Sequence, residues 1–286
     1  MALRQILFPV DFSEACEQIA PQVRFLCERF RASLTLAHFI YIPPMVYGAI
    51  DASGPVVWPV EEFIANAGQR LKTFSENFFP GLEAQIVVRG GDPATCIPDL
   101  AASHPFDLVA MPTHGHGRFR VLLLGSVTAK TLHDAPCAVW TACHTAKQRP
   151  PEPWKRILCA IDTDEEGVRL LRKAAELSEN GTISVRVIHA VPAAGPIEDP
   201  SAEFTFEQFL LKTAETTVAR LQAAAGTAFE ALVKPGAIAE VVRGEAADWQ
   251  ADIVLIGRGV LPRFAGQLRS HAYPIIRAAP CPVLTV

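Results

Sequence analysis

The sequence lacks the long apolar runs, the positive charge and the paired cysteines that mark several classes of protein. Although 50% of its 286 residues are hydrophobic, no apolar run approaches the ~18 residues that a membrane span needs. Lys and Arg number 26 against 30 Asp and Glu, for a formal net charge of −4. This balance argues against binding to nucleic acid or to an anionic membrane, and we expect neither as a partner.

A disulfide framework and a zinc site are also not indicated. The seven cysteines are irregularly spaced, most lie in apolar segments, and none forms a C-x-x-C pair. This usage is typical of buried, reduced thiols. The N-terminus reaches the carboxylate of Asp11 too soon for a signal peptide and is typical of a first strand. We therefore expect a cytoplasmic protein.

What the sequence does contain is an internal repeat. Three segments of the first half recur in the same order in the second: Arg4–Asp11 as Lys155–Asp162, 106–111 as 251–256, and 135–141 as 279–285. His38 and His189 lie in corresponding predicted strands, and we expect both to be satisfied core histidines. Similar segments that recur in the same order in both halves indicate a tandem duplication. We predict domains at 1–146 and 153–286, joined by a polar, proline-rich linker at 147–152.

Each half alternates strands with helices, and its strands are nearly continuous apolar runs, which is typical of a parallel sheet covered on both faces. The strands expected in the first half are Leu3–Val10, Ser33–Ile40, Ala84–Val88, Phe106–Met111 and Cys137–Cys143. In the helix after the first strand, Pro21 predicts a kink or a delayed start. The stripe of Phe63, Phe74 and Phe78 is expected in the core. The long loop 43–59 is a candidate lid or binding loop.

One glycine-rich stretch, Met111 to Val127, joins a predicted strand to a predicted helix at 127–133. Such a connection forms an anion site, because backbone N–H groups and the helix dipole point at one spot. Gly115 and Gly117 can take positive φ, Gly125 lets a phosphate approach, and Ser126 can cap the helix or donate to a phosphate. The alternative is an ordinary strand-to-helix connection.

Asp11 is predicted to lie close to this stretch. Ligands of open α/β sheets bind beyond the carboxyl ends of the strands, where the winding direction reverses. If the first and fourth strands are neighbours there, Asp11 and the loop after Met111 meet in one crevice. Asp11 and Asp162 could act as general bases, but no nucleophile or second acid accompanies them. Capping a helix or binding a hydroxyl is the favoured interpretation.

The residues that line this crevice carry a family resemblance. Ile6-Leu-Phe-Pro-Val-Asp11-Phe-Ser13, Thr113-His-Gly115 and Leu123-Leu-Gly125-Ser126-Val127 are similar to motifs of the universal stress protein family. Each half resembles one such domain, and the two cover essentially the whole chain. The resemblance implies two flavodoxin-like domains of the Rossmann-like, adenine nucleotide alpha hydrolase-like type. Each would hold a five-stranded parallel sheet of order 3-2-1-4-5 with helices on both faces.

The resemblance also implies a ligand and an assembly. The family's ATP-binding pattern, Gly-x2-Gly-x9-Gly-[Ser/Thr], aligns with Pro112-x2-Gly115-x9-Gly125-Ser126. The expected ligand is ATP, ADP or AMP, with magnesium accompanying the nucleotide. The expected contacts are Pro9 and Asp11 with ribose and adenine, Phe39 and Met111 with the base, Pro112 at the first pattern position, and Gly115, Gly125, Ser126 and Val127 with the phosphates. The fifth strands, 137–143 and 281–286, would pair as an intramolecular pseudo-dimer, and a further homodimer stays open.

Two departures from the pattern bear on this expectation. Pro112 has no N–H to donate, and a hydrogen bond to a charged group is worth roughly 1.5–3 kcal/mol, so its loss weakens binding without abolishing it. In the second half Gly257 keeps the first glycine, but Arg269 replaces the phosphate-approach glycine. We favour a degenerate second site over an altered anion site built from Arg258, Arg263 and Arg269. Thr163-Asp164 adds further negative charge there.

Other polar residues of the glycine-rich loop have competing interpretations. His114 and His116 could form a metal pair, but no cysteine or carboxylate at ligand spacing accompanies them. Contacts with phosphate or solvent are favoured instead. Arg118 and Arg120 could reach a phosphate tail or lie exposed, and the sequence favours neither.

We therefore predict a tandem universal stress protein that binds ATP or a related adenine nucleotide in its N-terminal domain. It would act in the stress response as a binding and regulatory module, with no catalytic residue assigned. One alternative is a ligand-free interaction scaffold, which Pro112 and Arg269 favour. Another is an enzyme on the same fold, either a slow ATP hydrolase or a phosphoryl or adenylyl transferase. No acid–base pair supports it.

Overall fold

The computed structural model describes residues 3–41, 50–51, 54–55, 60–115, 124–142, 153–178, 181–193, 200–258 and 272–286. It divides into two compact units, one holding the described residues up to Val139 and the other those from Trp140 onward. Several residues named above lie outside the described ranges, namely most of the loop 43–59 together with His116, Gly117, Arg118, Arg120, Cys143, Arg263 and Arg269.

The N-terminal half contains an open sheet with the strand order β7-β6-β1-β2-β5. Its strands are β1 Gln5–Pro9, β2 Ser33–Ile40, β5 Ala84–Gly90, β6 Leu108–Pro112 and β7 Ala138–Ala142. A short antiparallel pair, β3 Ile50–Asp51 and β4 Gly54–Pro55, lies apart from it. β1 runs parallel to both β2 and β6, and β2 runs parallel to β5. The winding therefore reverses between β1 and β6.

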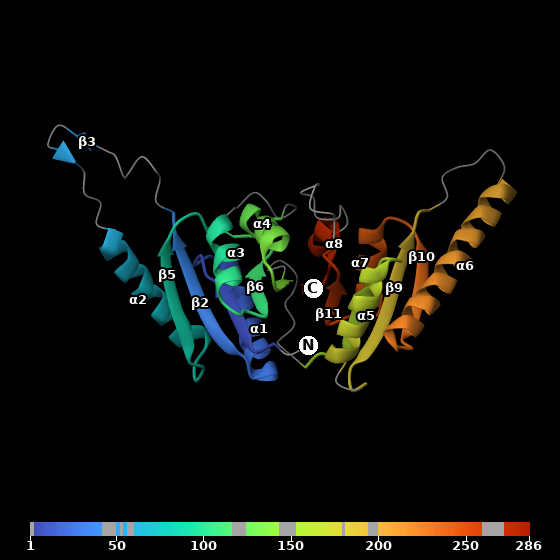
Figure 1. Ribbon diagram of the computed structural model, residues 1–286, viewed down its shortest axis with the longest axis horizontal. Coiled ribbons are helices and arrows are strands. Elements are labelled where there is room, and N and C mark those ends of the chain that lie inside the picture. The colour runs from blue at the N-terminus through green and yellow to red at the C-terminus, as the bar shows by residue number, and fades with distance from the viewer. Residues whose placement is uncertain are drawn as a thin grey trace. The chain divides into compact units, whose positions relative to one another are not determined.

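Two layers of helices cover this sheet (Figure 1). The helices are α1 Glu14–Phe30, α2 Val60–Phe78, α3 Pro93–Ser103 and α4 Ser126–Asp134. α1 contacts α2, and α3 contacts α4. Because both faces are covered, β1 is a continuous apolar run, and its Ile6, Leu7 and Phe8 are fully buried.

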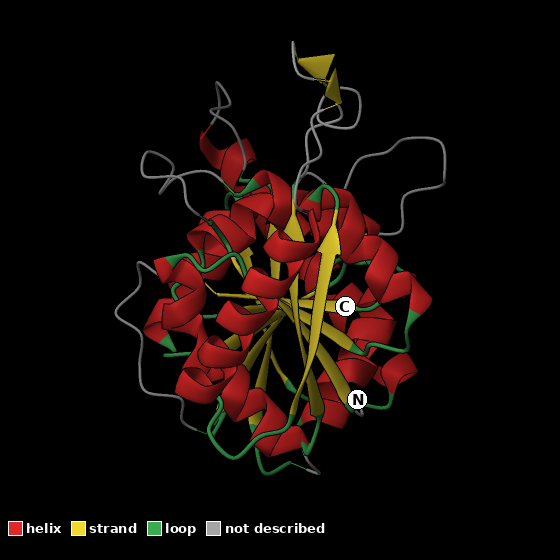
Figure 2. Cartoon of the chain, turned by 90° about the vertical axis from the view of Figure 1, so that its left-hand side faces the viewer, coloured by secondary structure: helices red, strands yellow, loops and turns green. Residues whose placement is uncertain are grey.

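The C-terminal half repeats the arrangement with the order β10-β9-β8-β11-β12, and all four neighbouring pairs are parallel. Its strands are β8 Arg156–Ala160, β9 Ser184–Val191, β10 Glu230–Pro235, β11 Ile253–Ile256 and β12 Val283–Thr285. Its helices are α5 Glu165–Leu177, α6 Pro200–Ala225, α7 Ile238–Asp248 and α8 Ala272–Ala278. Figure 2 shows the helices around the strands. The predicted α/β fold and the order 3-2-1-4-5 are confirmed in both halves.

The central strands of each half are fixed to each other at their amino ends by one carboxylate. Asp107, just before β6, accepts the N–H groups of Arg4 and Gln5 at 2.7 and 3.0 Å. Asp252, just before β11, accepts those of Lys155 and Arg156 at 2.7 and 2.9 Å. This contact explains why β6 begins at Leu108, two residues later than predicted.

One prediction about α2 is wrong, and one of the two alternatives for α1 is excluded. α1 begins at Glu14 and continues through the exposed Pro21, so its start is not delayed, and the kink stays a prediction. On α2, Phe74 is buried and Phe78 is half-buried, but Phe63 is 47% exposed. Phe63 lies in the first turn of α2, and the first buried residue of this helix is Ala67.

The C-terminal half carries an ionic cluster for which the described residues of the N-terminal half show no equivalent, since Thr35 stands in the place of Arg186. The buried Glu245 of α7 accepts Arg186 Nη1 at 2.7 Å and Lys234 Nζ at 2.6 Å. Arg186 also pairs with Glu230, and its Cζ lies 4.5 Å from the centre of the Trp249 ring. Burial disfavours the charged Glu245 carboxylate, but the bonds from Lys234 and Arg186 outweigh burial and hold its pKa below the ordinary value.

Candidate functional site

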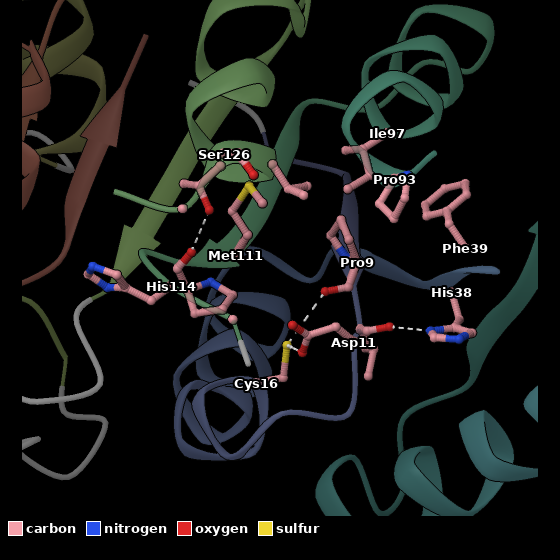
Figure 3. Close-up of a pocket in the computed structure, with 16 residues that line it drawn as sticks. Pro9, Asp11, Cys16, His38, Phe39, Pro93, Ile97, Met111, His114 and Ser126 are labelled. Atoms are coloured by element: carbon pink, nitrogen blue, oxygen red, sulfur yellow. Dashed lines mark hydrogen bonds between the residues drawn. The ribbon is translucent and has the colours of Figure 1, made fainter. Parts of the chain in front are cut away.

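A cavity of about 390 Å³ opens at the carboxyl ends of β1 and β6, in the N-terminal half. Its lining includes all nine residues predicted for the site: Pro9, Asp11, Phe39, Met111, Pro112, Gly115, Gly125, Ser126 and Val127. β1 and β6 are paired neighbours, so the predicted crevice at the reversal of winding forms as the sequence indicated (Figure 3). A cavity of this size falls in the range of small-molecule sites, roughly 300–1,000 Å³.

One part of the cavity is apolar. Pro9, Phe39 and Met111 stand at the ends of three adjacent strands and are all buried. Pro93 and Ile97 of α3 lie beside Phe39 (Figure 3). Asp92 caps α3 by accepting the N–H of Ala94, and this fixes where the helix begins. The apolar part can accept a flat ring that excludes water.

The N-terminus of α4 forms a second, polar part of the cavity. The Gly125 N–H donates to Thr113 O at 2.9 Å, and Thr128 Oγ1 donates to Pro112 O at 3.0 Å, so the helix is anchored to the end of β6. The N-cap is Gly125, which has no side chain to bond the first turn. The first backbone N–H groups and the helix dipole are therefore left for an anion. Of the two roles predicted for Ser126, capping is excluded because Ser126 is the first residue of the helix, and donation to a phosphate stays a prediction.

Asp11 and Gly115 both line the cavity, and the Asp11 carboxylate lies directly beside Gly115. Its Oδ1 accepts the Ser13 N–H at 2.9 Å and the Cys16 thiol at 3.1 Å. A Cβ on Gly115 would come within 2.5 Å of Asp11 Oδ2. Gly115 does not take positive φ, so the predicted reason for this glycine is wrong, and close approach to the carboxylate is the reason instead. Ser13, rather than Asp11, caps α1.

The histidines near the site have defined partners. His38 Nδ1 lies 2.7 Å from Val10 O, and His189 Nδ1 lies 2.9 Å from Ile161 O, so both rings are satisfied as predicted. Both are half-buried rather than in the core, and His38 lines the cavity. His114 is buried, with Nδ1 2.9 Å from Thr113 Oγ1. Of the two contacts predicted for His114, solvent is excluded by this burial, and phosphate stays a prediction.

Phe12 holds the turn that carries Asp11, although no sequence signal marked it. Its backbone is in the left-handed region, with φ of 59°, a strained conformation for a bulky residue. The ring lies between Arg70, whose Cζ is 4.1 Å from its centre, and the His38 ring at 4.7 Å. These contacts compensate for the strain and fix the turn. Arg70 comes from α2, so only the folded chain brings the three side chains together.

The equivalent place in the second half is nearly closed. A cavity of about 50 Å³ lies between Asp162, Gly257 and α5. The side chain of Glu166 fills the space, since a Cβ on Gly257 would lie 2.6 Å from Glu166 Oε1. Gly167 replaces Cys16 of the first half, and Asp162 Oδ1 accepts the N–H of Thr163 at 2.9 Å.

Within the part of the chain that the structure describes, no three His, Cys, Asp or Glu residues come together as a metal site. None of the helices described has both the length and the apolar composition to cross a membrane.

An open α/β sheet with a cavity at its reversal of winding defines the class of α/β proteins that bind a small ligand beyond their strand ends. The chain belongs to the universal stress protein family. The family's model matches it twice, at residues 2–142 and 153–286. The family assignment and its tandem form, predicted from the sequence, are confirmed.

Individual relatives support the assignment. A universal stress protein of Methanocaldococcus jannaschii is 26% identical over 141 residues, which is 48% of this chain and 79% of that protein. A solved universal stress protein from Archaeoglobus fulgidus has a TM-score of 0.66 at 21% identity, covering 98% of this chain and 95% of its own. A functionally unknown protein of Pseudomonas aeruginosa PAO1 has a TM-score of 0.65 at 16% identity, and the match covers 100% of this chain and 92% of that protein's chain. Both structures share the fold.

Proposed function

We propose that the N-terminal half binds ATP or a related adenine nucleotide and that the protein acts in the stress response as a nucleotide-dependent binding module. The observation that carries this proposal is the cavity of about 390 Å³, where an apolar part, a carboxylate and an uncapped helix N-terminus meet. These three features match the base, the sugar and the phosphates of a nucleotide.

Each part has chemistry suited to its portion of the ligand. Phe39, Met111 and Pro9 offer apolar surface to a purine ring. The Asp11 carboxylate accepts hydrogen bonds from sugar hydroxyls. The first turn of α4 offers N–H groups to phosphate oxygens. Because Pro112 contributes its carbonyl to Thr128 and has no N–H, we expect moderate affinity.

A magnesium ion would enter with the nucleotide. Since the described residues include no group of three metal ligands, the phosphates would supply the ion with most of its oxygen ligands, as is usual for magnesium. Asp11 is the carboxylate of the cavity that could add to them.

The decisive experiment is calorimetric titration of the full chain with ATP, ADP and AMP, together with analysis of nucleotide released on heat denaturation. Gly125→Arg should abolish binding, because its side chain would occupy the space before the first turn of α4. Gly68→Arg is the matched control. It places the same side chain on α2, where a Cβ would meet nothing within 4 Å, so binding should be unchanged.

The two other candidate functions are outcomes of the same experiment. No bound nucleotide and no titration signal in the millimolar range would overturn nucleotide binding and favour an interaction scaffold. Steady phosphate release that Gly125→Arg abolishes would favour a slow ATP hydrolase. Simple binding remains the proposal, because the apolar part, the carboxylate and the helix N-terminus of the cavity match the three parts of a nucleotide.

We further propose domains at 1–146 and 153–286 and pairing of the two fifth strands within the chain. The hydroxyl of Thr141, at the end of β7, donates to Val283 O of β12 at 3.4 Å, and both residues belong to the second unit. A reducing, cytoplasmic environment fits the cysteines, since none of the six that are described takes part in a disulfide.

A further inference from the structure

One wall of the cavity carries a thiol that no sequence motif singled out. Cys16 lies in the first turn of α1 with 1% of its surface exposed. Its Sγ is 3.1 Å from Asp11 Oδ1 and 3.8 Å from Pro9 O. A carboxylate and a carbonyl only accept hydrogen bonds, so the thiol must donate. Burial and then the Asp11 charge raise the pKa of Cys16, which keeps its proton in place at neutral pH.

The thiol helps to decide how the Asp11 carboxylate is turned. Oδ1 receives two donors, the Ser13 N–H and the Cys16 thiol, from the turn and helix that follow β1. Because Oδ1 points toward α1, the other carboxylate oxygen, Oδ2, points toward Gly115. A Cβ added to Gly115 would lie 2.5 Å from this Oδ2. Figure 3 shows Cys16 directly beside the carboxylate.

We propose that Cys16 is a positioning residue for the sugar of the ligand: its neutral thiol holds Asp11 so that Oδ2 is turned to accept ribose hydroxyls. This inference rests on the proposed function and adds a specificity to it, namely selection of a ribose over a sugar without hydroxyls. The second half has no counterpart, because Gly167 stands in the place of Cys16.

The test compares two ligands on the full chain, ATP and dideoxy-ATP, which lacks both ribose hydroxyls. The wild type should bind ATP more tightly. Cys16→Ala should weaken ATP binding about fivefold, the value of one modest hydrogen bond, and leave dideoxy-ATP unchanged. Cys16→Ser keeps a donor at the same place and should retain the preference for ATP. Isothermal titration calorimetry measures all of these affinities.

Cys27→Ala is the matched control. Cys27 lies on the same helix, is equally buried at 1% exposed, and does not line the cavity. Its replacement removes a buried thiol without touching Asp11, so the preference for ATP should be unchanged. Thermal unfolding by circular dichroism reports whether each variant folds. If Cys16→Ala does not fold, Cys16→Val fills the space without a donor and carries the same expected loss.

The possible outcomes separate this inference from the proposed function. Equal losses for ATP and dideoxy-ATP in Cys16→Ala would mean that the thiol only packs, and would overturn the positioning role. An unchanged preference in the same variant would overturn it too. If the wild type binds neither ligand, the proposed function itself fails, and the role of Cys16 fails with it.

Discussion

The two halves of the chain share one topology but differ at the carboxyl ends of their strands. The first half keeps a cavity of about 390 Å³ there, and the second keeps about 50 Å³. Both retain the aspartate after the first strand, Asp11 and Asp162. Ala15 in the first half corresponds to Glu166 in the second, and this one longer side chain fills the space beside Gly257. A retained motif residue therefore does not make a site when a neighbouring helix occupies the space.

The halves also differ on the face that α3 and α7 cover. In the second half Arg186, Lys234 and Glu230 surround the buried Glu245. The corresponding part of the first half contains Thr35, which donates to Gln85 Oε1 at 3.4 Å. On this face, ionic contacts thus stabilise the half with the small cavity, while the half with the large cavity has a neutral hydrogen bond in the same place.

The largest effect should come from breaking the ionic cluster. Glu245→Ala removes the acceptor that Arg186 and Lys234 share and should cost the second half about 3 kcal/mol of unfolding free energy. Urea unfolding measures the loss, and hydrogen exchange in β9 and β10 locates it. Glu230→Ala is the control. Because the Glu230 side chain is 58% exposed, its loss should cost less than about 1 kcal/mol.

The same cluster predicts a pH dependence. The pKa of Glu245 is lowered in the folded protein, so its contribution to stability is complete above the ordinary carboxyl value of 4.5 and is lost as pH falls through the folded value. Denaturant titrations of wild type and Glu245→Gln should therefore converge in acid. A difference in stability that is constant down to the acid transition would contradict the assignment.

A smaller effect is expected at Gly115. Gly115→Ala forces Asp11 Oδ2 away from a Cβ that would lie 2.5 Å from it. ATP should bind about tenfold more weakly, as expected for one hydrogen bond to a charged group. The matched variant in the second half, Gly257→Ala, meets Glu166 instead and should leave ATP affinity unchanged in the same titration. A similar loss in both variants would contradict the assignment of the ligand to the first half.

Ser126→Ala should have a modest effect. The proposed anion site is the backbone of the first turn of α4, to which the exposed Ser126 hydroxyl would add one solvent-exposed hydrogen bond. ATP affinity should fall about threefold. A hundredfold loss would show that the hydroxyl, rather than the helix N-terminus, dominates phosphate binding.

The smallest effect is expected from Glu166→Ala. The space freed by removing one side chain is smaller than the difference between the two cavity volumes, about 50 and about 390 Å³. Equilibrium dialysis should therefore still find one ATP per chain. Two bound nucleotides would show that Glu166 alone closes the second site and would erase the difference between the halves.

Much of the fold could be predicted because it depends on periodic signals. Continuous apolar runs predicted the central strands, and repeated sequence segments predicted the duplication. Errors arose where a tertiary contact overrides the local pattern, as at Asp107, whose bonds to Arg4 and Gln5 delay the start of β6. Phe63 matched the helical stripe, but the first turn of α2 leaves it exposed.

The nine site residues came together because they lie at strand ends and at a helix N-terminus, places that a sequence pattern marks. Residues that complete the site were missed because they reach it from helix faces. Cys16 and Ile97 have this position. Glu166, which fills the corresponding space of the second half, was missed for the same reason, since nothing in the local sequence reports which way a helix faces. The left-handed backbone of Phe12 depends on Arg70, which lies far along the chain.

The aspartates at the amino ends of the central strands, Asp107 and Asp252, have a consequence for how the two halves of a duplicated chain can differ. Asp107 and Asp252 tie the two central strands together at the edge remote from the cavity, in the same way in both halves. The register of the two central strands is thus fixed at their amino ends, independently of the site at their carboxyl ends. The second copy therefore keeps the same architecture although its cavity is small and Glu166 stands in the place of Ala15.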